Sequence, residues 1–309
     1  MIKTALLFAG QGAQAVGMGR EFAAQFPAAR TLFDQANAAL GYDLAAVCFD
    51  GPDAELTKTG HAQPGIFLTS WVAFELLRER VPGLEFGATA GLSLGEFTAL
   101  AAAGVMRFEE GLRVVRQRGQ FMQQACEATR GGMAAIIGLD EAPTREVCAG
   151  AGVELANLNC PGQLVISGDV AGIAKACELA KARGARRALP LPVAGAYHSR
   201  LMAVAQPKLA AALGDISLAT PRVPVISNVT ARPHSTTGEI QRLLVEQVTA
   251  SVRWEESMRF LLAQGFTRFI ELGPGTTLAG FMKRIDKSAQ VLNVENAASL
   301  DATAKAILA

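Results

Sequence analysis

The chain has 309 residues, half of them hydrophobic and 18% charged, with a formal net charge of +1. This composition is globular and excludes an intrinsically disordered protein, and the length allows one large or two modest domains. The near-neutral charge gives no support for a protein that coats nucleic acid.

The sequence also argues against export and against a membrane anchor. The apolar run at the N-terminus is too short for a signal peptide, and no apolar stretch approaches the ~18 residues of a spanning helix. The five cysteines are scattered, without a CxxC pair. We therefore expect reduced thiols, a cytoplasmic location and no structural zinc site.

The first part of the chain alternates short apolar runs with helical periodicity, which is typical of an α/β protein with a mostly parallel sheet. In chain order we expect a strand at 4–9, helices at 21–40 and 63–80, a strand at 86–92 and helices at 94–103 and 108–126. Pro64 is expected near the first turn of the second helix, a position that tolerates proline.

After Gly131-Gly132 the pattern changes to β-α-β-β-α-β, the order of a ferredoxin-like unit. Its elements are expected at 133–139, 142–149, 153–158, 163–167, 169–183 and 185–193. We predict that this unit, residues 131–195, is inserted into a large α/β domain made of residues 1–130 and 196–309. There the pattern resumes with a strand at 223–226, helices at 239–248 and 255–263, a strand at 267–272 and a last helix.

The segment Gly91-Leu92-Ser93-Leu94-Gly95 matches the GxSxG nucleophile elbow, with a strand before it and a helix after it. So tight a turn needs small flanking residues, and it holds the serine hydroxyl at a helix N-terminus. There the amide of Leu94 and the helix dipole would stabilise an oxyanion. This pattern predicts a nucleophilic Ser93.

A nucleophilic serine needs a base, and the chain has three histidines. His234 lies in a polar, turn-rich loop and is expected at the surface, and His61 is expected to be a cap or loop residue. His198 lies where the predicted insert rejoins the large domain, a place where clefts form, and is therefore our predicted base. Glu96 is expected to satisfy local amides in the first turn of its helix, so a backbone carbonyl would orient the imidazole in a Ser-His dyad.

Two further features have both a functional and an ordinary interpretation. The turn Gly10-Gln11-Gly12 follows the first strand and would offer a second oxyanion donor, or be a simple βα turn; it lacks the ending of a phosphate loop. Arg118 would hold a substrate carboxylate by a two-pronged contact. Alternatively Arg118 is solvated, as most arginines are, since Arg113 and Arg116 lie on the same helix.

These residues resemble the malonyl-CoA:acyl-carrier-protein transacylases, nearly from end to end. The resemblance is carried by residues 8–12, 91–96, 117–122, 132–139, 157–168, 197–199, 247–254 and 271–275. It implies an α/β-hydrolase-like parallel-sheet core with an inserted ferredoxin-like subdomain, as the pattern does. It also implies a ping-pong malonyl transfer in fatty-acid biosynthesis, with malonyl-CoA and acyl carrier protein as partners, no cofactor or metal, no nucleic acid or membrane, and a monomeric protein.

By position, the resemblance assigns Ser93 as nucleophile and His198 as base. It assigns the amides of Gln11 and Leu94 as oxyanion donors, Arg118 as the clamp on the malonyl carboxylate, and the main-chain carbonyl of Gln247 as the group that orients the histidine. It therefore favours the functional interpretation of Arg118.

The chain departs from many relatives at Leu92, where they have a histidine that can hydrogen-bond. Tyr197 stands where malonyl-selective relatives often have a bulky aromatic residue. Three alternatives stay open: an acyltransferase subunit of malonate decarboxylase, a discrete polyketide-synthase acyltransferase, and, in another class, a serine thioesterase or hydrolase. The elbow alone fits the hydrolase equally well, and a carrier-docking subunit without activity is disfavoured by Ser93 and His198.

Overall fold

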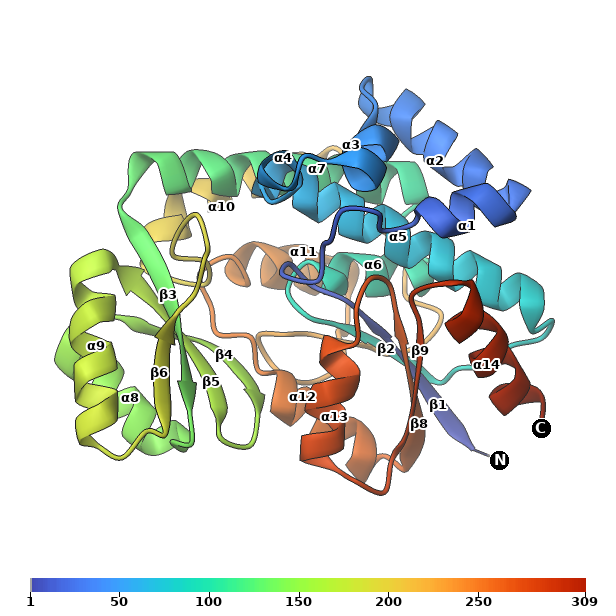
Figure 1. Cartoon of the computed structure of the whole chain (residues 1–309). Coiled ribbons are helices and arrows are strands. Elements are labelled where there is room, and N and C mark those ends of the chain that lie inside the picture. The colour runs from blue at the N-terminus through green and yellow to red at the C-terminus, as the bar shows by residue number, and fades with distance from the viewer. Residues whose placement is uncertain (1) are drawn as a thin grey trace.

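The computed structural model describes residues 2–309, and its larger sheet is wholly parallel (Figure 1). The strand order in these residues is β7-β2-β1-β8-β9, with every neighbouring pair parallel. The strands are β1 (Lys3–Phe8), β2 (Ala88–Gly91), β7 (Val225–Ile226), β8 (Phe266–Leu272) and β9 (Gln290–Val294). Because all strands run the same way, the turns after β1, β2 and β8 meet at one edge, where α/β sites form.

Helices cover both faces of this sheet, and β1 shows why. Its side chains alternate between faces, so Leu6 and Phe8 enter one apolar cluster while Ala5 and Leu7 enter the other. The first cluster is covered by α5 (Thr59–Arg80), α6 (Gly95–Ala102) and α7 (Phe108–Ala128), and the second by α12 (Trp254–Ala263) and α13 (Thr277–Ile285).

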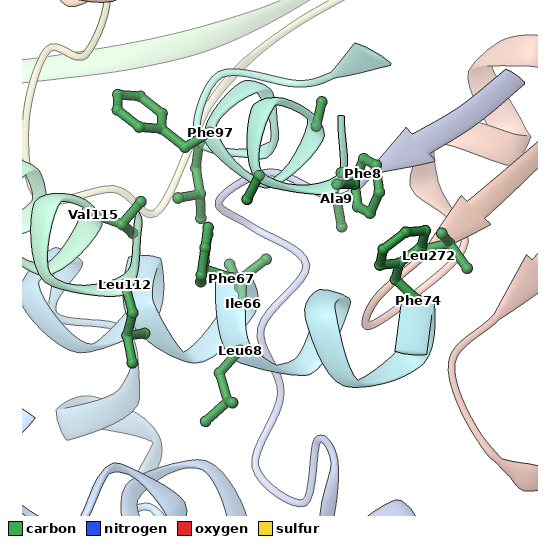
Figure 2. Close-up of a cluster of buried hydrophobic side chains, with 14 of the residues drawn as sticks. Phe8, Ala9, Ile66, Phe67, Leu68, Phe74, Phe97, Leu112, Val115 and Leu272 are labelled. Atoms are coloured by element: carbon green, nitrogen blue, oxygen red, sulfur yellow. The ribbon is translucent and has the colours of Figure 1, made fainter. Parts of the chain in front are cut away.

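The larger apolar cluster includes side chains of β1, α5, α6 and α7 and is rich in aromatic residues (Figure 2). Phe8 at the end of β1 meets Phe74 of α5 edge to face, with ring centroids 6.2 Å apart. Burying a side chain of this size stabilises the fold by roughly 1.5–3 kcal/mol. This packing fixes α5 and α6 against the edge of the sheet from which Ser93 projects.

The second sheet is antiparallel and is built from one continuous part of the chain. Its order is β4-β5-β3-β6 within the described residues, and α8 and α9 pack on one face around a separate apolar cluster. The elements are β3 (Gly131–Ile137), α8 (Glu141–Ala151), β4 (Glu154–Cys160), β5 (Gln163–Asp169), α9 (Val170–Ala182) and β6 (Arg187–Pro190). The expected β-α-β-β-α-β order is confirmed, while the division of the chain into two domains stays a prediction.

Two helix expectations were wrong in their boundaries. The single helix expected at 21–40 is two helices, α1 (Arg20–Gln25) and α2 (Pro27–Leu40), because Phe26 before the proline is extended. The residue before a proline avoids the helical region, and proline starts a helix better than it continues one. The helix α5 begins at Thr59, so Pro64 lies in its second turn rather than its first.

The end of the chain also differs from expectation. The helix α13 is not the last, because β9 adds an edge strand beside β8 and α14 (Ala297–Leu308) follows it. Other elements were missed because they are too short to show a period. These are α3 (Leu44–Asp50), α4 (Asp53–Leu56), the 3-10 helix η1 (Arg200–Ala205) and α10 (Gln206–Gly214); α11 spans Thr237–Glu246 close to expectation.

Among residues 2–309 no helix is long and apolar enough to cross a bilayer. In the same residues no group of His, Cys, Asp and Glu side chains is arranged to hold a metal ion. The cysteines are all free and buried.

Candidate active site

The elbow is a turn of three residues between β2 and α6, and steric contacts explain its glycines. A Cβ on Gly91 would collide with the backbone of Gly95, and a Cβ on Gly95 would collide with the carbonyl of Phe8. Ser93 between them has φ 53°, in the left-handed region that side chains other than glycine rarely adopt. The crowding that the sequence predicted is therefore present, and it projects the hydroxyl from the edge of the sheet.

The hydroxyl of Ser93 is hydrogen-bonded to an imidazole from a distant part of the chain. Ser93 Oγ lies 2.8 Å from Nε2 of His198, and the Nδ1 of His198 lies 2.8 Å from the carbonyl oxygen of Gln247 and 3.2 Å from that of Ala250. Carbonyls only accept, so the proton of the neutral ring is on Nδ1, and Nε2 accepts the serine proton. This is the geometry of a general base, oriented without a carboxylate.

The segment that orients the imidazole is fixed from two sides. The amide of Val252 donates to the carbonyl of Ala156 on β4 at 2.8 Å, and the amide of Leu158 donates back to Val252 at 2.9 Å. On the other side the amide of Arg253 donates to the carbonyl of Asn228 at 2.9 Å. An edge strand of the antiparallel sheet thus supports the base, which links the two sheets at the site.

Arg118 lies on α7 with its guanidinium buried beside the serine. It donates to Gln63 Oε1 at 2.7 Å, to Gln247 Oε1 at 2.9 Å and to Ser93 Oγ at 3.2 Å, and lies 5.4 Å from the ring of Phe97. The side chain is only 1% exposed, so the solvated alternative is wrong. Within residues 2–309 it forms no ion pair, and its Nε has no hydrogen-bond partner.

Burial and this guanidinium together set the charge of the site. Burial, with the Arg118 charge nearby as the second cause, lowers the pKa of His198 to about 4, so the imidazole is neutral at physiological pH. Burial likewise lowers the pKa of Arg118 to about 10, opposed by the nearby Glu96. Arg118 therefore stays cationic, and the site combines a neutral base with a fixed positive charge.

A cleft of about 700 Å³ opens above these groups, between the two sheets. Ser93, Arg118 and His198 lie along it. Its other walls include Asn159 on β4 and Phe281 on α13. A cleft of this size, largely apolar with a few convergent polar groups, fits an extended small-molecule substrate.

The two predicted oxyanion donors have different surroundings. Gln11 lines the cleft, and its side-chain Oε1 accepts a hydrogen bond of 2.7 Å from Thr59. Leu94 follows the serine and precedes α6. Neither backbone amide donates to another group of residues 2–309. Their role as oxyanion donors stays a prediction.

Leu92, the departure from many relatives, has an apolar role. Its side chain packs beside the cluster under α12 and α13, and its carbonyl accepts from the amide of Gly95 at 2.9 Å. A Cβ on Gly10 would collide with this carbonyl, so Gly10 lets the first turn pass close to the elbow. The leucine thus anchors the turn by packing rather than by a side-chain hydrogen bond.

Two expectations about neighbouring residues were wrong. His234 is not at the surface: its Nε2 lies 2.8 Å from Oε1 of Glu96, with both side chains wholly buried. Glu96 does not satisfy local amides either, because its other partners are the amide of Asn228 and Nε2 of Gln247. The loop around His234 looks polar in sequence, but its backbone is tied to Val225 on β7, which draws the ring beneath the elbow.

His61, the other candidate base, is away from the serine. It lies in the first turn of α5, where Nδ1 is 3.0 Å from Glu55 Oε1. Gln63, one turn of helix after Thr59, was not predicted at the site, and its side-chain oxygen accepts from Arg118. Its position on the buried side of α5 could have indicated a polar partner for Gln63, because an unpaired buried amide is costly.

Three comparisons with known proteins show which family the chain is similar to. The family model described as acyl transferase domain matches residues 5–305. The malonyl CoA-acyl carrier protein transacylase of Bacillus subtilis (strain 168) is 44% identical over 306 residues, which are 97% of this chain and 96% of that protein.

Solved structures are equally similar. The acyl-carrier-protein S-malonyltransferase of Burkholderia pseudomallei 1710b superposes with a TM-score of 0.95 at 42% identity, covering 98% of this chain and 100% of that one. A malonyl-transacylase solved in complex with its holo type II polyketide-synthase acyl-carrier protein has a TM-score of 0.95 at 37% identity, covering 98% of this chain and 99% of that one.

Proposed function

The chain belongs to the acyl transferase domain family, and we propose that it moves a malonyl group from malonyl-CoA to the phosphopantetheine thiol of an acyl carrier protein. The relatives that match nearly its whole length are named for this reaction. The reaction supplies malonyl units to fatty-acid biosynthesis.

The observation that carries this proposal is the unpaired charge of Arg118. A buried guanidinium without a carboxylate is costly, so its position next to the nucleophile requires a functional reason. The free carboxylate of a malonyl group supplies the missing anion, since the guanidinium can hold it by charge-assisted hydrogen bonds. An acyl group without that carboxylate leaves the charge unpaired, which is the basis of selection.

In the first half-reaction Ser93 becomes acylated. Its hydroxyl proton passes to Nε2 of His198 as Oγ attacks the thioester carbonyl, and the amides of Gln11 and Leu94 stabilise the oxyanion. The intermediate collapses with cleavage of the carbon–sulfur bond, and the CoA sulfur takes the proton from His198. The main-chain carbonyl of Gln247 holds the imidazole in register throughout.

The second half-reaction reverses these steps with a different thiol. The pantetheine thiol of the carrier gives its proton to His198 and attacks the malonyl ester, and Ser93 Oγ leaves and recovers the proton. Every proton and electron pair comes from the two substrates and these two side chains, so the scheme uses no cofactor. We further propose that the protein acts as a monomer in the cytoplasm, with no nucleic-acid or membrane partner.

Intact mass spectrometry after mixing with malonyl-CoA tests the proposal. We expect one malonyl adduct that is absent in Ser93→Ala and is discharged by holo carrier protein with formation of malonyl-carrier. Without carrier the adduct should persist. Rapid release of free malonate would instead identify a thioesterase, and an adduct unchanged in Ser93→Ala would remove Ser93 as the nucleophile.

A further inference from the structure

Glu96 is a wholly buried carboxylate that the reaction scheme does not use. It lies in the first turn of α6, three residues after the nucleophile, and three N–H groups converge on it. Its Oε2 accepts from the amide of Asn228 at 3.0 Å and from Nε2 of Gln247 at 2.7 Å, and its Oε1 lies 2.8 Å from Nε2 of His234. A carboxylate is the one side chain that can accept from all three donors.

Asn228, the first of these partners, holds the elbow directly. Its side-chain Oδ1 accepts from the amide of Ser93 at 2.6 Å, and its Nδ2 donates to the carbonyl of Gly91 at 2.7 Å. One amide side chain therefore fixes the backbone on both sides of Leu92. Because Ser93 has a left-handed backbone, such contacts are what keep the turn from relaxing.

Gln247, the second partner, connects the same carboxylate to the rest of the site. The guanidinium of Arg118 can only donate, so Oε1 of Gln247 faces it and Nε2 faces the opposite way. There Nε2 donates to the carbonyl of Ser93 at 3.0 Å as well as to Glu96. The carbonyl of Gln247 meanwhile accepts from His198. Ser93, His198 and Arg118 are thus each hydrogen-bonded to Gln247, which is itself hydrogen-bonded to Glu96.

His234 is the third hydrogen-bond partner of Glu96. Its Nδ1 has no hydrogen-bond partner among residues 2–309, so a proton on Nε2, where an acceptor is present, is the satisfied arrangement. The ring therefore donates its one N–H to Glu96 and holds the carboxylate in place. This contact joins the loop after β7 to the helix after β2.

We propose that Glu96 is a positioning residue for acyl transfer: through Asn228 and Gln247 it holds Ser93, His198 and Arg118 in their reacting arrangement. The inference rests on the proposed function, because positioning is defined for the acylation of Ser93. It assigns to Glu96 the supporting role that a third triad member has elsewhere, exerted on the backbone of the elbow rather than on the imidazole. The contribution lies in the hydrogen bonds and not in the negative charge.

Two substitutions separate hydrogen bonding from charge. In Glu96→Gln the single amide oxygen can accept from both Asn228 and Gln247, and its NH₂ can donate to His234 if that ring moves its proton to Nδ1. In Glu96→Ala all three donors lose their acceptor. We expect Glu96→Gln to acylate within about threefold of the unmodified protein, and Glu96→Ala to acylate about 100-fold more slowly, the scale of a small misplacement of reacting groups.

The measurement is the single-turnover rate constant of malonyl-enzyme formation by rapid quench and intact mass, with the amplitude recorded separately. A purely structural role lowers the amplitude and the melting temperature but not the rate constant of the molecules that react. Thr303→Val is the matched control, because it deletes a buried hydrogen bond of 2.8 Å to Asn293, far from the elbow. We expect it to change stability alone, with the rate constant unchanged.

Asn228→Ala keeps the experiment decisive where Glu96→Ala does not fold, since it removes the two elbow contacts and leaves the Glu96–His234 pair intact. It should slow acylation to a similar extent while the malonyl-CoA concentration at half-saturation stays within about threefold. Unchanged rate constants in both variants would overturn the proposal, as would a Glu96→Gln variant as slow as Glu96→Ala. Failure of the function itself is distinct, because then the unmodified protein forms no adduct.

Discussion

Ser93 and His198 share an unusual backbone conformation at the point where their side chains meet. Their φ angles are 53° and 59°, and their Oγ and Nε2 atoms lie 2.8 Å apart. Among residues 2–309 other than glycine, only Ala231 also has a positive φ. Each such residue costs about 1–3 kcal/mol, so the surrounding contacts must hold both chain segments against relaxation.

Adding a methyl group at Gly95 should damage both the fold and the elbow. In Gly95→Ala the new Cβ meets the carbonyl of Phe8, so α6 must shift away from β1. We expect a loss of about 1–3 kcal/mol in the free energy of unfolding and a slower acylation of Ser93. Chemical denaturation and the single-turnover assay measure the two effects.

The control for this substitution is Gly280→Ala on α13. A Cβ there meets no atom within 4 Å, and the helix gains from replacing glycine. We expect equal or higher stability and unchanged acylation. If Gly95→Ala behaved like Gly280→Ala in both assays, the close packing of the elbow on β1 would not matter for the reaction.

Local features of the sequence predicted the elbow well, because the steric contacts that shape it involve residues close together in the sequence. A strand, a serine between two glycines and a helix follow one another in a few residues, and the steric demand acts within that stretch. The alternation of elements predicted both sheets for the same reason. His198 was predicted near Ser93 from its place at the junction, although its acceptors on Gln247 and Ala250 come from a segment about fifty residues later.

Contacts between segments that are distant in the sequence could not be predicted from local sequence patterns. Glu96 and His234 are 138 residues apart, and only the parallel arrangement of β2 and β7 brings them together. The sequence did contain a signal that Arg118 is buried. It lies three residues after Val115 and four before Met122, on the buried stripe of α7, whereas Arg113 lies off that stripe. An arginine on an apolar stripe needs a partner, and in the proposed reaction that partner is the malonyl carboxylate.

The pH dependence of acylation should report the low pKa of His198. The neutral imidazole is the base, so the rate constant should be flat above about pH 6 and fall with a midpoint near pH 4, where the ring becomes protonated. An unperturbed histidine would give a midpoint near 6.5. A midpoint at that higher value in the single-turnover assay would contradict the buried environment described for the ring.

The lowered pKa of His198 also predicts how the stability of the folded protein depends on pH. The pKa of His198 is lower in the folded protein than in the unfolded chain, so the unfolded chain binds the proton more readily. This contribution to stability is present above about pH 6.5 and is lost as the pH falls toward 4. In His198→Ala that part of the acid dependence of the melting temperature should disappear.

The cysteines should be almost inert in the folded protein. Burial raises the pKa of Cys48 to about 12 and that of Cys148 to about 11, and it raises those of the other three as well. Since the thiolate is the reactive form, alkylation of Cys48 by iodoacetamide near pH 8 should be about a thousandfold slower than for a free cysteine. Mass spectrometry of the native and denatured protein gives the comparison, and fast native labelling would show that these sites open.

Selection of the acyl group is the sharpest test of Arg118. In Arg118→Ala the malonyl carboxylate loses its cation, and we expect kcat/KM for malonyl-CoA to fall by about 100-fold, a loss in the range of a buried charge pair. For acetyl-CoA, which has no carboxylate, the loss should be less than about tenfold, because only the hydrogen bonds of the guanidinium to Ser93 Oγ, Gln63 and Gln247 are removed. Arg118→Lys should recover little, since an ammonium cannot bridge Gln63, Gln247 and a carboxylate at once.

The ratio of the two losses carries the argument, because misfolding or a displaced Ser93 would lower both substrates alike. Arg113→Ala is the matched control: its side chain is exposed on the same helix, does not line the cleft, and donates to the carbonyl of Ala39. It should leave the malonyl-to-acetyl ratio unchanged. Equal losses for the two substrates in Arg118→Ala would remove the clamp from the scheme, and the buried charge would then serve only to hold Gln247 beside the elbow.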